Sequence, residues 1–506
     1  MYVTQALHRL VQQDPHRPMT ICGGRVRSVG ESADRVARLA AGLRGLGVRR
    51  GDRVAVLGPN SDQYHESLLA AAWADAVVMP IDYRWSPSEI SYALRDCDAS
   101  VLVADAAFLP VVDSRPELVN LRTVVMGDTA ASAGTVCYEE LIEGSAAMPD
   151  SCRGGDALFG IFYTGGTTAR PKGVMLTHAN MLTSAFGSLA TGQFVTPGGR
   201  ILHTAPMFHL AGLAVWTAAL ITGGTHVILP AFTPTDVLTA IEDHGITDIL
   251  LVPTMIQLLV DALRRGEYDV SSLRHLVYGG APMPVSLLAR TRDALRDTGF
   301  VQAYGMTELA PVATLLLPTD HDDPGIAGSA GRAAPHAEVR VVGPGGTELS
   351  TGAVGEVIVR GGHVMSGYWG RPEETAAAVR DGWMHTGDAG YLDGRGYLFI
   401  VDRIKDMTIS GGENAFPAEV EAVLAQHPGV AMSAVIGLPD DRWGERVHAV
   451  VVPSDTGRTD AGKLREHCLE HLARYKIPRD IEFVTELPVS AAGKVLKRQL
   501  RQQRVR

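Results

Sequence analysis

Short apolar runs that end at glycine or proline, each following a helical period, constrain the fold of this chain most. Apolar side chains recur at helical spacing from Val36 to Leu46, and a buried-strand pattern with a turn on each side follows at residues 51–60. A second helical pattern over residues 64–76 leads directly into the apolar run at residues 77–81. This alternation predicts a parallel sheet covered by helices, because parallel strands need a crossover that is usually a helix.

The same alternation continues through the middle of the chain. Apolar runs at residues 225–230, 246–253, 273–280 and 299–305 each end at glycine or proline. Ligands of open parallel sheets bind beyond the carboxyl ends of the strands. We therefore expect several glycine-rich turns to converge on one cleft.

The pattern changes twice towards the carboxyl end. Closely spaced apolar runs from about Gly328 to Asp402 predict an antiparallel sheet or small barrel, and the remaining residues suit a separate α+β unit. The 506 residues exceed what one hydrophobic core holds. We expect an α/β protein with a large N-terminal domain (residues 1–402) of helix-covered, mostly parallel sheets plus a small β-barrel-like subdomain. A hinge at 403–406 and a small mobile α+β C-terminal domain at 407–506 complete this prediction.

Charge and cysteine content exclude several classes of protein. A net charge of −10 gives no electrostatic footprint for nucleic acid. The five cysteines are scattered, so their spacing supports neither a disulfide framework nor a zinc site. The amino terminus has no apolar core of signal-peptide length. A transmembrane segment is not apparent either, because this would need an apolar run of about 18 residues. A cytoplasmic location follows by default.

One segment, "YTGGTTARPKG" at residues 163–173, suits neither a helix nor a strand. It follows an apolar strand pattern, and a helix pattern begins after Thr177. A glycine-rich turn there can aim several backbone N–H groups at one anion, while threonine hydroxyls and Lys172 add donors and charge. The segment therefore predicts a polyphosphate site, with a plain surface turn as the alternative.

Other nucleotide and hydrolase motifs do not match. A Walker A loop needs Gly before its Lys and Ser or Thr after it, whereas Pro171 and Gly173 flank Lys172. There is no G-x-S-x-G elbow of a serine hydrolase and no G-x-G-x-x-G dinucleotide fingerprint.

Six segments, in their order along the chain, resemble the signature motifs of the adenylate-forming superfamily. They are "YTGGTTARPKG", "QAYGMTE" (302–308), "HTGD" (385–388), "DRIKD" (402–406), "SGGEN" (410–414) and "PVSAAGKVLK" (488–497). The superfamily includes acyl-CoA synthetases, aryl-CoA ligases, luciferases and peptide-synthetase adenylation domains. The resemblance covers nearly the whole chain, and six ordered motifs are far more specific than one.

The resemblance implies an acyl-CoA synthetase that uses ATP, Mg²⁺ and coenzyme A. A carboxylate attacks the α-phosphate of ATP, pyrophosphate leaves, and the thiol of CoA then displaces AMP from the acyl-adenylate. Both steps add negative charge that preorganised donors and cations can offset. The implied partners are a small-molecule carboxylic acid, ATP and CoA. A homodimer is compatible with the sequence.

The resemblance also implies roles for residues of the large domain. The loop around the β- and γ-phosphates consists of Thr164, Gly165, Gly166, Thr167, Thr168 and Lys172. The adenine slot consists of Gly280, Ala281, Pro282, Gln302, Ala303 and Tyr304. Thr307 would contact the α-phosphate, Glu308 would bind Mg²⁺, and His209 would gate the acyl site. Taken alone, a tyrosine or histidine of this kind would more often be ordinary core.

Further roles fall near and beyond the hinge. Asp388 would accept hydrogen bonds from the ribose hydroxyls, and Arg403 would reach the ribose or a phosphate. Lys494 would bridge the carboxylate and the α-phosphate during adenylation. Lys405 lies at the family's hinge, where the small domain rotates between the two steps. Gly411 and Gly412 would let the backbone pass beside the pantetheine tunnel.

Two loop residues depart from the common pattern Y-T-S-G-T-T-G. Gly165 replaces the serine, which removes a hydroxyl, and one neutral hydrogen bond contributes about 1 kcal/mol. Ala169 replaces the last glycine, where a positive φ is disfavoured for a residue with Cβ. Both changes favour slower adenylation, while the remaining threonines and Lys172 argue against an inactive loop.

Small residues around His209 indicate the class of acid. Ala211, Gly212, Ala214, Gly279 and Gly305 would leave room, and there is no obvious buried Asp to receive the ammonium group of an amino acid. We expect a hydrophobic and bulky acid of fatty, aryl or polycyclic type.

Three other functions stay open at this point. An enzyme that adenylates the acid and passes it to a carrier protein or partner enzyme is the first alternative. "SGGEN" and "DRWGE" (441–445) lie where CoA ligases of the family build their thiol side, which favours CoA. A luciferase-like oxygenase and a non-catalytic nucleotide-binding scaffold have less support from these residues.

Overall fold

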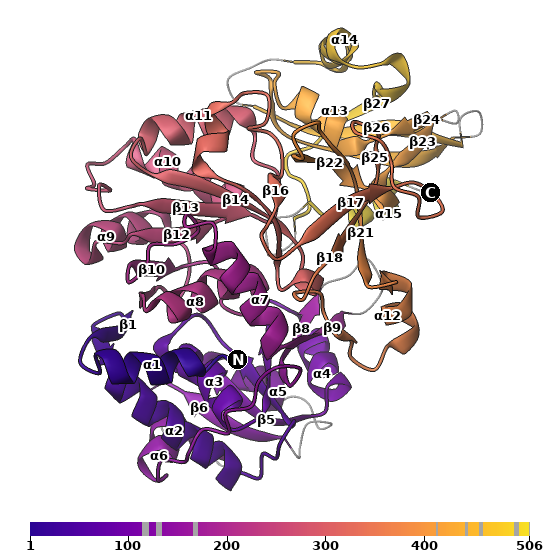
Figure 1. Cartoon of the computed structure of the whole chain (residues 1–506). Helices are drawn as coiled ribbons and strands as arrows, with labels where there is room; N and C mark the ends of the chain where they lie inside the picture. The colour runs from indigo at the N-terminus through magenta and orange to yellow at the C-terminus, as the bar shows by residue number, and fades with distance from the viewer. Residues whose placement is uncertain are drawn as a thin grey trace. The chain divides into compact units, whose positions relative to one another are not determined.

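The computed structural model describes most of the chain (Figure 1). The described residues are 1–113, 121–127, 134–164, 171–410, 413–440, 444–454, 459–489 and 495–504. Their internal contacts define two compact units. The first comprises Met1–Val339 and Val359–Met384, and the second comprises Arg340–Ile358 and His385–Arg506.

A large, mostly parallel sheet of the first unit has the strand order β16-β15-β14-β13-β12-β10-β11-β1-β2. The strands from β1 to β14 along this order are parallel neighbours, whereas β2, β15 and β16 are antiparallel additions at its edges. Its strands are β1 (Pro18–Cys22), β2 (Arg25–Ser28), β10 (Arg200–His203), β11 (Thr225–Ile228), β12 (Asp248–Leu251), β13 (His275–Gly279), β14 (Gly299–Gly305), β15 (Val312–Leu316) and β16 (Arg332–Ala333).

A second sheet of the same unit has the order β19-β9-β8-β4-β3-β5-β6-β7. The strands from β8 to β7 along this order pair in parallel, and β9 pairs antiparallel with both β8 and β19. Its strands are β3 (Arg53–Leu57), β4 (Val77–Ile81), β5 (Ala99–Asp105), β6 (Arg122–Met126), β7 (Thr135–Cys137), β8 (Leu158–Thr164), β9 (Lys172–Thr177) and β19 (Gly367–Tyr368).

Helices cover these sheets because the apolar face of an amphipathic helix needs burial. In Figure 1, α9, α10 and α11 lie along the sheet that contains β12 and β13, and Val237 of α9 shares a core with Ile249 of β12. Ile90 of α4 shares another core with Met79 of β4. The helices of this unit are α1 (Gln5–Gln13), α2 (Val29–Gly45), α3 (Asp62–Trp73), α4 (Pro87–Asp96), α5 (Leu109–Asp113), α6 (Tyr138–Glu143), α7 (His178–Leu189), α8 (Leu210–Thr222), α9 (Pro234–His244), α10 (Pro253–Leu263), α11 (Val285–Ala294) and α12 (Pro372–Ala378).

A smaller sheet has the order β17-β18-β21-β20, with β22 also paired to β21. The pairs of β21 with β20 and with β22 are antiparallel, as the closely spaced apolar runs predict. Its strands are β17 (Glu338–Val342), β18 (Gly355–Arg360), β20 (Val379–Arg380), β21 (Trp383–Leu392) and β22 (Leu398–Arg403).

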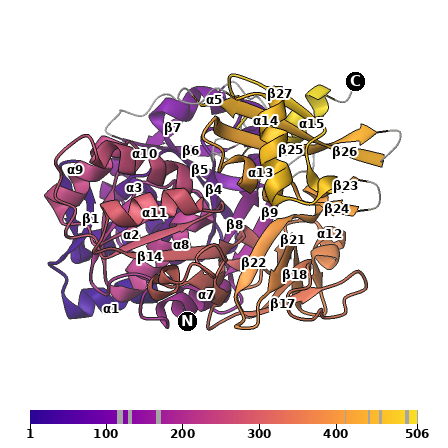
Figure 2. The same ribbon diagram turned by 90° about the horizontal axis from the view of Figure 1, so that it is seen from above.

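Among its described residues, the last part of the second unit combines a sheet with three α-helices. The sheet order is β24-β23-β26-β25, and β27 pairs in parallel with β26. Figure 2 shows α13 beside β25, and Val420 of α13 shares a core with Val435 of β25. The elements are β23 (Thr408–Ser410), β24 (Glu413–Ala415), α13 (Pro417–Leu424), β25 (Val430–Asp440), β26 (Gly444–Pro453), α14 (Ala461–His471), β27 (Asp480–Phe483) and α15 (Lys497–Arg504).

The predicted fold class is confirmed, with one element unforeseen. The segment after β8 was expected to lead straight to a helix, but β9 intervenes and forms a hairpin with β8. The helix itself begins as predicted, because Thr177 and Asn180 form a capping box at the start of α7. The hinge at 403–406, and with it the division at residue 402, stays a prediction; Ile404–Asp406 form the 3₁₀ helix η5 of the second unit.

No helix among the described residues is both long enough and apolar enough to cross a bilayer.

Candidate functional site

The β8–β9 hairpin positions the glycine-rich segment. Thr164 and Lys172 are cross-strand partners at the end of this hairpin, so they flank the segment between them on directly opposed backbones. Both side chains are half-buried. Gly165, Gly166, Thr167 and Thr168 lie outside the described residues, as does Ala169.

Lys172 is held by an acid and an aromatic ring. Its Nζ forms an ion pair with Glu374 of α12 and lies 5.2 Å from the ring centroid of Tyr368. Tyr368 reaches this place because β19 pairs with β9, where Tyr368 is the partner of Val174. A lysine ammonium over a tyrosine ring is a cation–π contact, which favours one position of the charge.

The same Tyr368 also holds Glu308. Its hydroxyl donates a hydrogen bond to Oε1 of Glu308 over 2.8 Å. Glu308 lies in the 3₁₀ helix η3 (Thr307–Leu309) and is only 7% exposed. Burial, followed by the charge of Glu308, raises the pKa of the Tyr368 hydroxyl above its usual value, so Tyr368 stays a protonated donor. Tyr368 therefore connects a cation and a buried carboxylate.

Glu308 suits the magnesium ion that the sequence predicts. Mg²⁺ takes oxygen ligands and is usually held by one or two carboxylates together with substrate phosphates. A buried carboxylate whose orientation is fixed by a tyrosine hydroxyl provides such an oxygen. The assignment of Glu308 as the metal ligand stays a prediction.

Two adjacent parallel strands bring the predicted adenine residues together. In the register of β13 and β14, Tyr278 opposes Gln302 and Gly279 opposes Ala303. The predicted residues therefore lie at the carboxyl edge of neighbouring strands. They are Gly280, Ala281 and Pro282 directly after β13, and Gln302, Ala303 and Tyr304 on β14.

This edge lies beside the carboxylate region. Thr307 follows β14 by two residues, is half-buried, and opens the η3 helix that contains Glu308. The continuous segment from Gln302 to Glu308 thus carries three of the predicted adenine residues together with Thr307. Residues 280–282 follow β13, the strand paired beside it. This arrangement fits the expectation that ligands bind beyond strand carboxyl ends.

His209 lies at the start of α8, where its side chain is exposed and makes no capping bond. The loop before it is fixed by Asn60, a residue that the sequence motifs missed. Oδ1 of Asn60 accepts from the backbone N–H of Met207 over 2.7 Å, and its amide donates to the carbonyl of Ala205 over 3.0 Å. Asn60 directly follows the glycine and proline that close the β3 pattern, but no spacing signal marked it.

The glycines expected to leave room for the acid have another explanation. A Cβ on Gly212 would lie 2.8 Å from the carbonyl oxygen of Pro206. A Cβ on Gly279 would meet the carbonyl of Ala303, and a Cβ on Gly305 would meet that of Pro311. These glycines allow backbones to approach closely, which accounts for glycine at these positions. Their role in leaving room for the acid stays a prediction.

In the second unit, Asp388 and Arg403 form a cross-strand pair of β21 and β22. Nε of Arg403 lies 2.6 Å from Oδ1 of Asp388, and Asp388 is 5% exposed. The preceding Gly387 has a φ of +69°, which favours glycine there. The "HTGD" motif lies within β21 and presents a buried, paired carboxylate.

The other predicted residues lie wholly or partly outside the described part of the chain. Lys405 belongs to η5, but its side chain lies outside the described part of the chain. Gly411, Gly412 and Lys494 also lie outside the described residues. Their roles stay predictions.

Two family models match the chain. Residues 7–369 match the model of AMP-binding enzymes, and residues 419–494 match the model of the AMP-binding enzyme C-terminal domain. The chain belongs to the AMP-binding enzyme family. The first match includes the β8–β9 hairpin and the η3 helix, and extends to the β19 strand.

Relatives of this AMP-binding enzyme match it over nearly its whole length. A feruloyl-CoA synthase from Amycolatopsis sp is 44% identical over 497 residues, which cover 97% of each chain. An indoleacetate–CoA ligase from Aromatoleum aromaticum is 40% identical over 478 residues, covering 94% of this chain and 92% of the relative. The solved o-succinylbenzoate CoA synthetase from Bacillus subtilis, in complex with its acyl-adenylate intermediate, has a TM-score of 0.87 and 32% identity. The match covers 98% of this chain and 97% of that chain.

The predicted reaction class is confirmed by these matches. The protein is an ATP-dependent, AMP-forming acid–thiol ligase with ATP and coenzyme A as substrates. Mg²⁺ is the metal of this family, and Glu308 fits it. The identity of the acid differs among the relatives and is not fixed by them.

Proposed function

We propose that this AMP-binding enzyme converts an aromatic carboxylic acid into its CoA thioester. Two relatives with at least 40% identity carry aromatic acids in their names, ferulate and indoleacetate. The solved relative acts on o-succinylbenzoate, again an aromatic acid. These names favour the aryl class among the fatty, aryl and polycyclic acids that the sequence left open.

The contact of Tyr368 with both Lys172 and Glu308 carries the catalytic part of this proposal. One aromatic side chain contacts the cation of Lys172, near the end of the glycine-rich segment, and orients a buried carboxylate. ATP needs both kinds of group, because its phosphates bind cations directly and also bind Mg²⁺. When bound, Mg²⁺ would offset the charge of the phosphates.

In the first step, a carboxylate oxygen of the acid attacks the α-phosphorus, and pyrophosphate leaves as acyl-AMP forms. Thr164 and Lys172, with Gly165, Gly166, Thr167 and Thr168, hold the leaving phosphates. Thr307 contacts the α-phosphate and Tyr304 packs on adenine. Lys494 brings a positive charge to the reacting carboxylate, which lowers the repulsion between two anions.

In the second step, the CoA thiolate attacks the acyl carbonyl carbon and AMP leaves. Asp388, fixed by Arg403, accepts hydrogen bonds from the ribose and keeps AMP in place until then. Rotation at residues 403–406, including Lys405, exchanges Lys494 for the backbone around Gly411 and Gly412. His209 stands exposed at the start of α8, where a side chain can open or close the acyl site.

A pyrophosphate-release assay tests the substrate class. Purified full-length enzyme is given ATP, Mg²⁺ and one acid at a time: ferulate, indoleacetate, benzoate, palmitate or acetate. We expect kcat/KM for the best aromatic acid to exceed that for palmitate and acetate at least about 10-fold, since a pocket shaped for a ring discriminates by about 1–3 kcal/mol against acids that do not fit it. Preference for palmitate would refute the aromatic class but leave the ligase reaction intact.

The acyl acceptor is tested in the same assay by adding CoA. Acyl-CoA formation with consumption of the thiol supports the proposal. Accumulation of acyl-AMP that only an acyl carrier protein discharges would favour the alternative, in which the enzyme passes its acyl group to a carrier protein or a partner enzyme.

Assembly and location complete the proposal. We propose a cytoplasmic enzyme, because buried Cys97, Cys137 and Cys468 are free thiols, as are exposed Cys152 and half-buried Cys22. We also propose a homodimer. Cell fractionation tests the first point, and light scattering during size-exclusion chromatography tests the second.

A further inference from the structure

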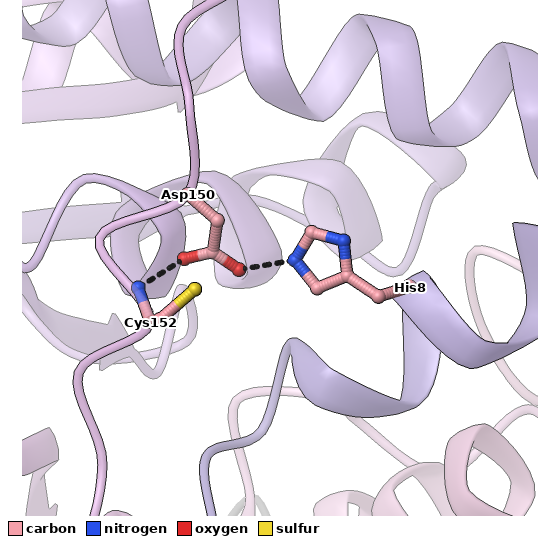
Figure 3. A group of neighbouring side chains, drawn as sticks. All are labelled: His8, Asp150 and Cys152. Atoms are coloured by element: carbon pink, nitrogen blue, oxygen red, sulfur yellow. Dashed lines mark hydrogen bonds and ion pairs between the residues drawn. The ribbon is translucent and has the colours of Figure 1, made fainter.

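Three metal-ligating side chains converge in the first unit, apart from the residues assigned to ATP. They are His8, Asp150 and Cys152 (Figure 3), and one ligand atom of each lies within 4.8 Å of the other two. His8 is on α1, whereas Asp150 and Cys152 lie in the segment between α6 and β8. More than a hundred residues separate the histidine from the other two, so no sequence spacing pointed to this group.

The carboxylate of Asp150 is fixed at the centre of the group. Its side chain is only 2% exposed. Oδ2 accepts a hydrogen bond from Oγ1 of Thr4 and contacts Nε2 of His8, each over 2.7 Å. Oδ1 accepts from the backbone N–H of Cys152 over 2.9 Å. Cys152 has a φ of +52°, which is uncommon for a residue with Cβ. Figure 3 shows its sulfur close to the carboxylate, which lies between the sulfur and the His8 ring.

The order of the groups argues against a nucleophilic cysteine. In a cysteine–histidine–acid triad the imidazole lies between the thiol and the carboxylate, because it must take the thiol proton. Here the carboxylate lies between the sulfur and the imidazole (Figure 3). Mg²⁺ and Ca²⁺ prefer oxygen ligands alone. A nitrogen, an oxygen and a sulfur around one point form a donor set that Zn²⁺ binds.

We propose that His8, Asp150 and Cys152 bind a zinc ion, with water as the fourth ligand. Binding releases the thiol proton of Cys152 to solvent and moves the ring proton of His8 from Nε2 to Nδ1, so that both side chains donate an electron pair to the metal. The ion connects α1 to the segment that leads into β8. It takes no part in the ligase reaction.

The test uses tag-free full-length protein that has been dialysed against a chelator. His467, Glu470 and His471 form a second group whose ligand atoms also lie within 4.8 Å of one another. We therefore measure binding in a His471→Ala background, which removes one ligand of that second group. Cobalt(II) serves as the optical probe, because a thiolate ligand adds a charge-transfer band, and zinc is counted by mass spectrometry.

We expect one zinc ion per chain and a cobalt–thiolate band in the His471→Ala protein. Adding Cys152→Ser should remove the band and weaken zinc binding at least about 10-fold, and Thr4→Val should weaken it about 10-fold by releasing the carboxylate. His16→Ala is the matched control, because His16 is an exposed histidine close to α1. Circular dichroism and pyrophosphate release verify the fold of every variant.

Two outcomes would overturn the site. Failure of the His471→Ala protein to retain zinc is one. Equal zinc affinity with and without Cys152→Ser is the other. Should Cys152→Ser not fold, His8→Ala provides the same comparison, since the His8 side chain is 39% exposed.

Discussion

At the scale of single residues, Tyr368 connects groups that the sequence places far apart. Its hydroxyl binds Glu308 and its ring lies under the ammonium of Lys172. A tyrosine in this position can orient a metal-binding carboxylate through a hydrogen bond, as outer ligands commonly do. Substitution by phenylalanine separates the contributions of the hydroxyl and the ring, because phenylalanine keeps the ring and lacks the hydroxyl.

Tyr368→Phe tests this connection. We expect the Mg²⁺ concentration for half-maximal pyrophosphate release to rise about 10-fold, because Glu308 loses the donor that orients it. Titration of Mg²⁺ at saturating ATP measures the change. Tyr138→Phe is the matched control, since the Tyr138 hydroxyl donates to buried Glu66 over 3.0 Å elsewhere in the same unit. An equal change in both variants would contradict a specific role of Tyr368.

At the scale of elements, the site depends on strand ends held in close backbone contact. The β14 strand carries Gln302 to Tyr304 and ends at Gly305, which pairs with Val312 of β15. The missing side chain of Gly305 faces the carbonyl oxygen of Pro311. Because that oxygen is backbone, it cannot swing away to admit a methyl group.

Gly305→Ala should therefore displace the end of β14 together with Thr307 and Glu308. We expect at least about a 10-fold loss of pyrophosphate release and a destabilisation of about 1–3 kcal/mol, as for other overpacked sites. Steady-state kinetics and thermal unfolding measure both effects. Gly328→Ala is the control, because a Cβ there meets no atom within 4 Å. Wild-type kinetics for Gly305→Ala would exclude this constraint.

At the scale of the whole molecule, the two half-reactions are expected to use different parts of the second unit. Asp388 and Arg403 form a pair there that does not depend on the residues beyond the predicted hinge. Lys494 belongs to a later motif that we expect to serve adenylation alone. The proposed rotation at residues 403–406 makes the two chemical steps separable by mutation.

Lys494→Ala tests that separation. We expect pyrophosphate release to fall at least about 100-fold, the usual loss on removing one preorganised charge or donor. Thioester formation from supplied acyl-AMP and CoA should keep at least half of its rate. Rapid-mixing assays of each half-reaction give the two values. Equal loss in both steps would argue against the assigned role.

Buried histidines predict how the stability of the first unit depends on pH. Burial lowers the pKa to about 4 for His65 and His178 and to about 3 for His203 and His363. In the unfolded chain these imidazoles titrate near 6.5. At a pH between the folded-state pKa and 6.5, the unfolded chain binds more protons than the folded protein. The free energy of unfolding therefore falls as the pH decreases below about 6.5.

We expect the urea midpoint to be nearly constant from pH 8 to 7 and to fall between pH 6.5 and 5. Each histidine adds up to about 1.4 kcal/mol per pH unit to this slope. His65→Gln should reduce this slope by the contribution of one histidine, because glutamine cannot be protonated. The glutamine side chain can still accept the hydrogen bond from Trp216. An unchanged slope in that variant would count against the assignment.

The sequence by itself determined the elements and the reaction class. The run at 77–81 became β4 with the same bounds, and that at 299–305 became β14, because burial imposes a local period on side chains. The glycine-rich segment was foreseen as a loop, but β9 was missed because its residues were read as part of that loop. The ordered motifs were enough to place the chain among AMP-forming ligases.

Only the tertiary structure decided which distant residues meet. Tyr368 reaches Glu308 and Lys172 because β19 pairs with β9, and strand order leaves no mark in hydrophobic period. The close backbone approach at Gly305 likewise depends on the route of the chain after β14. His8 meets Asp150 through the packing of α1. A linear pattern records how deeply each residue is buried, whereas contacts between segments arise only when the sheets assemble.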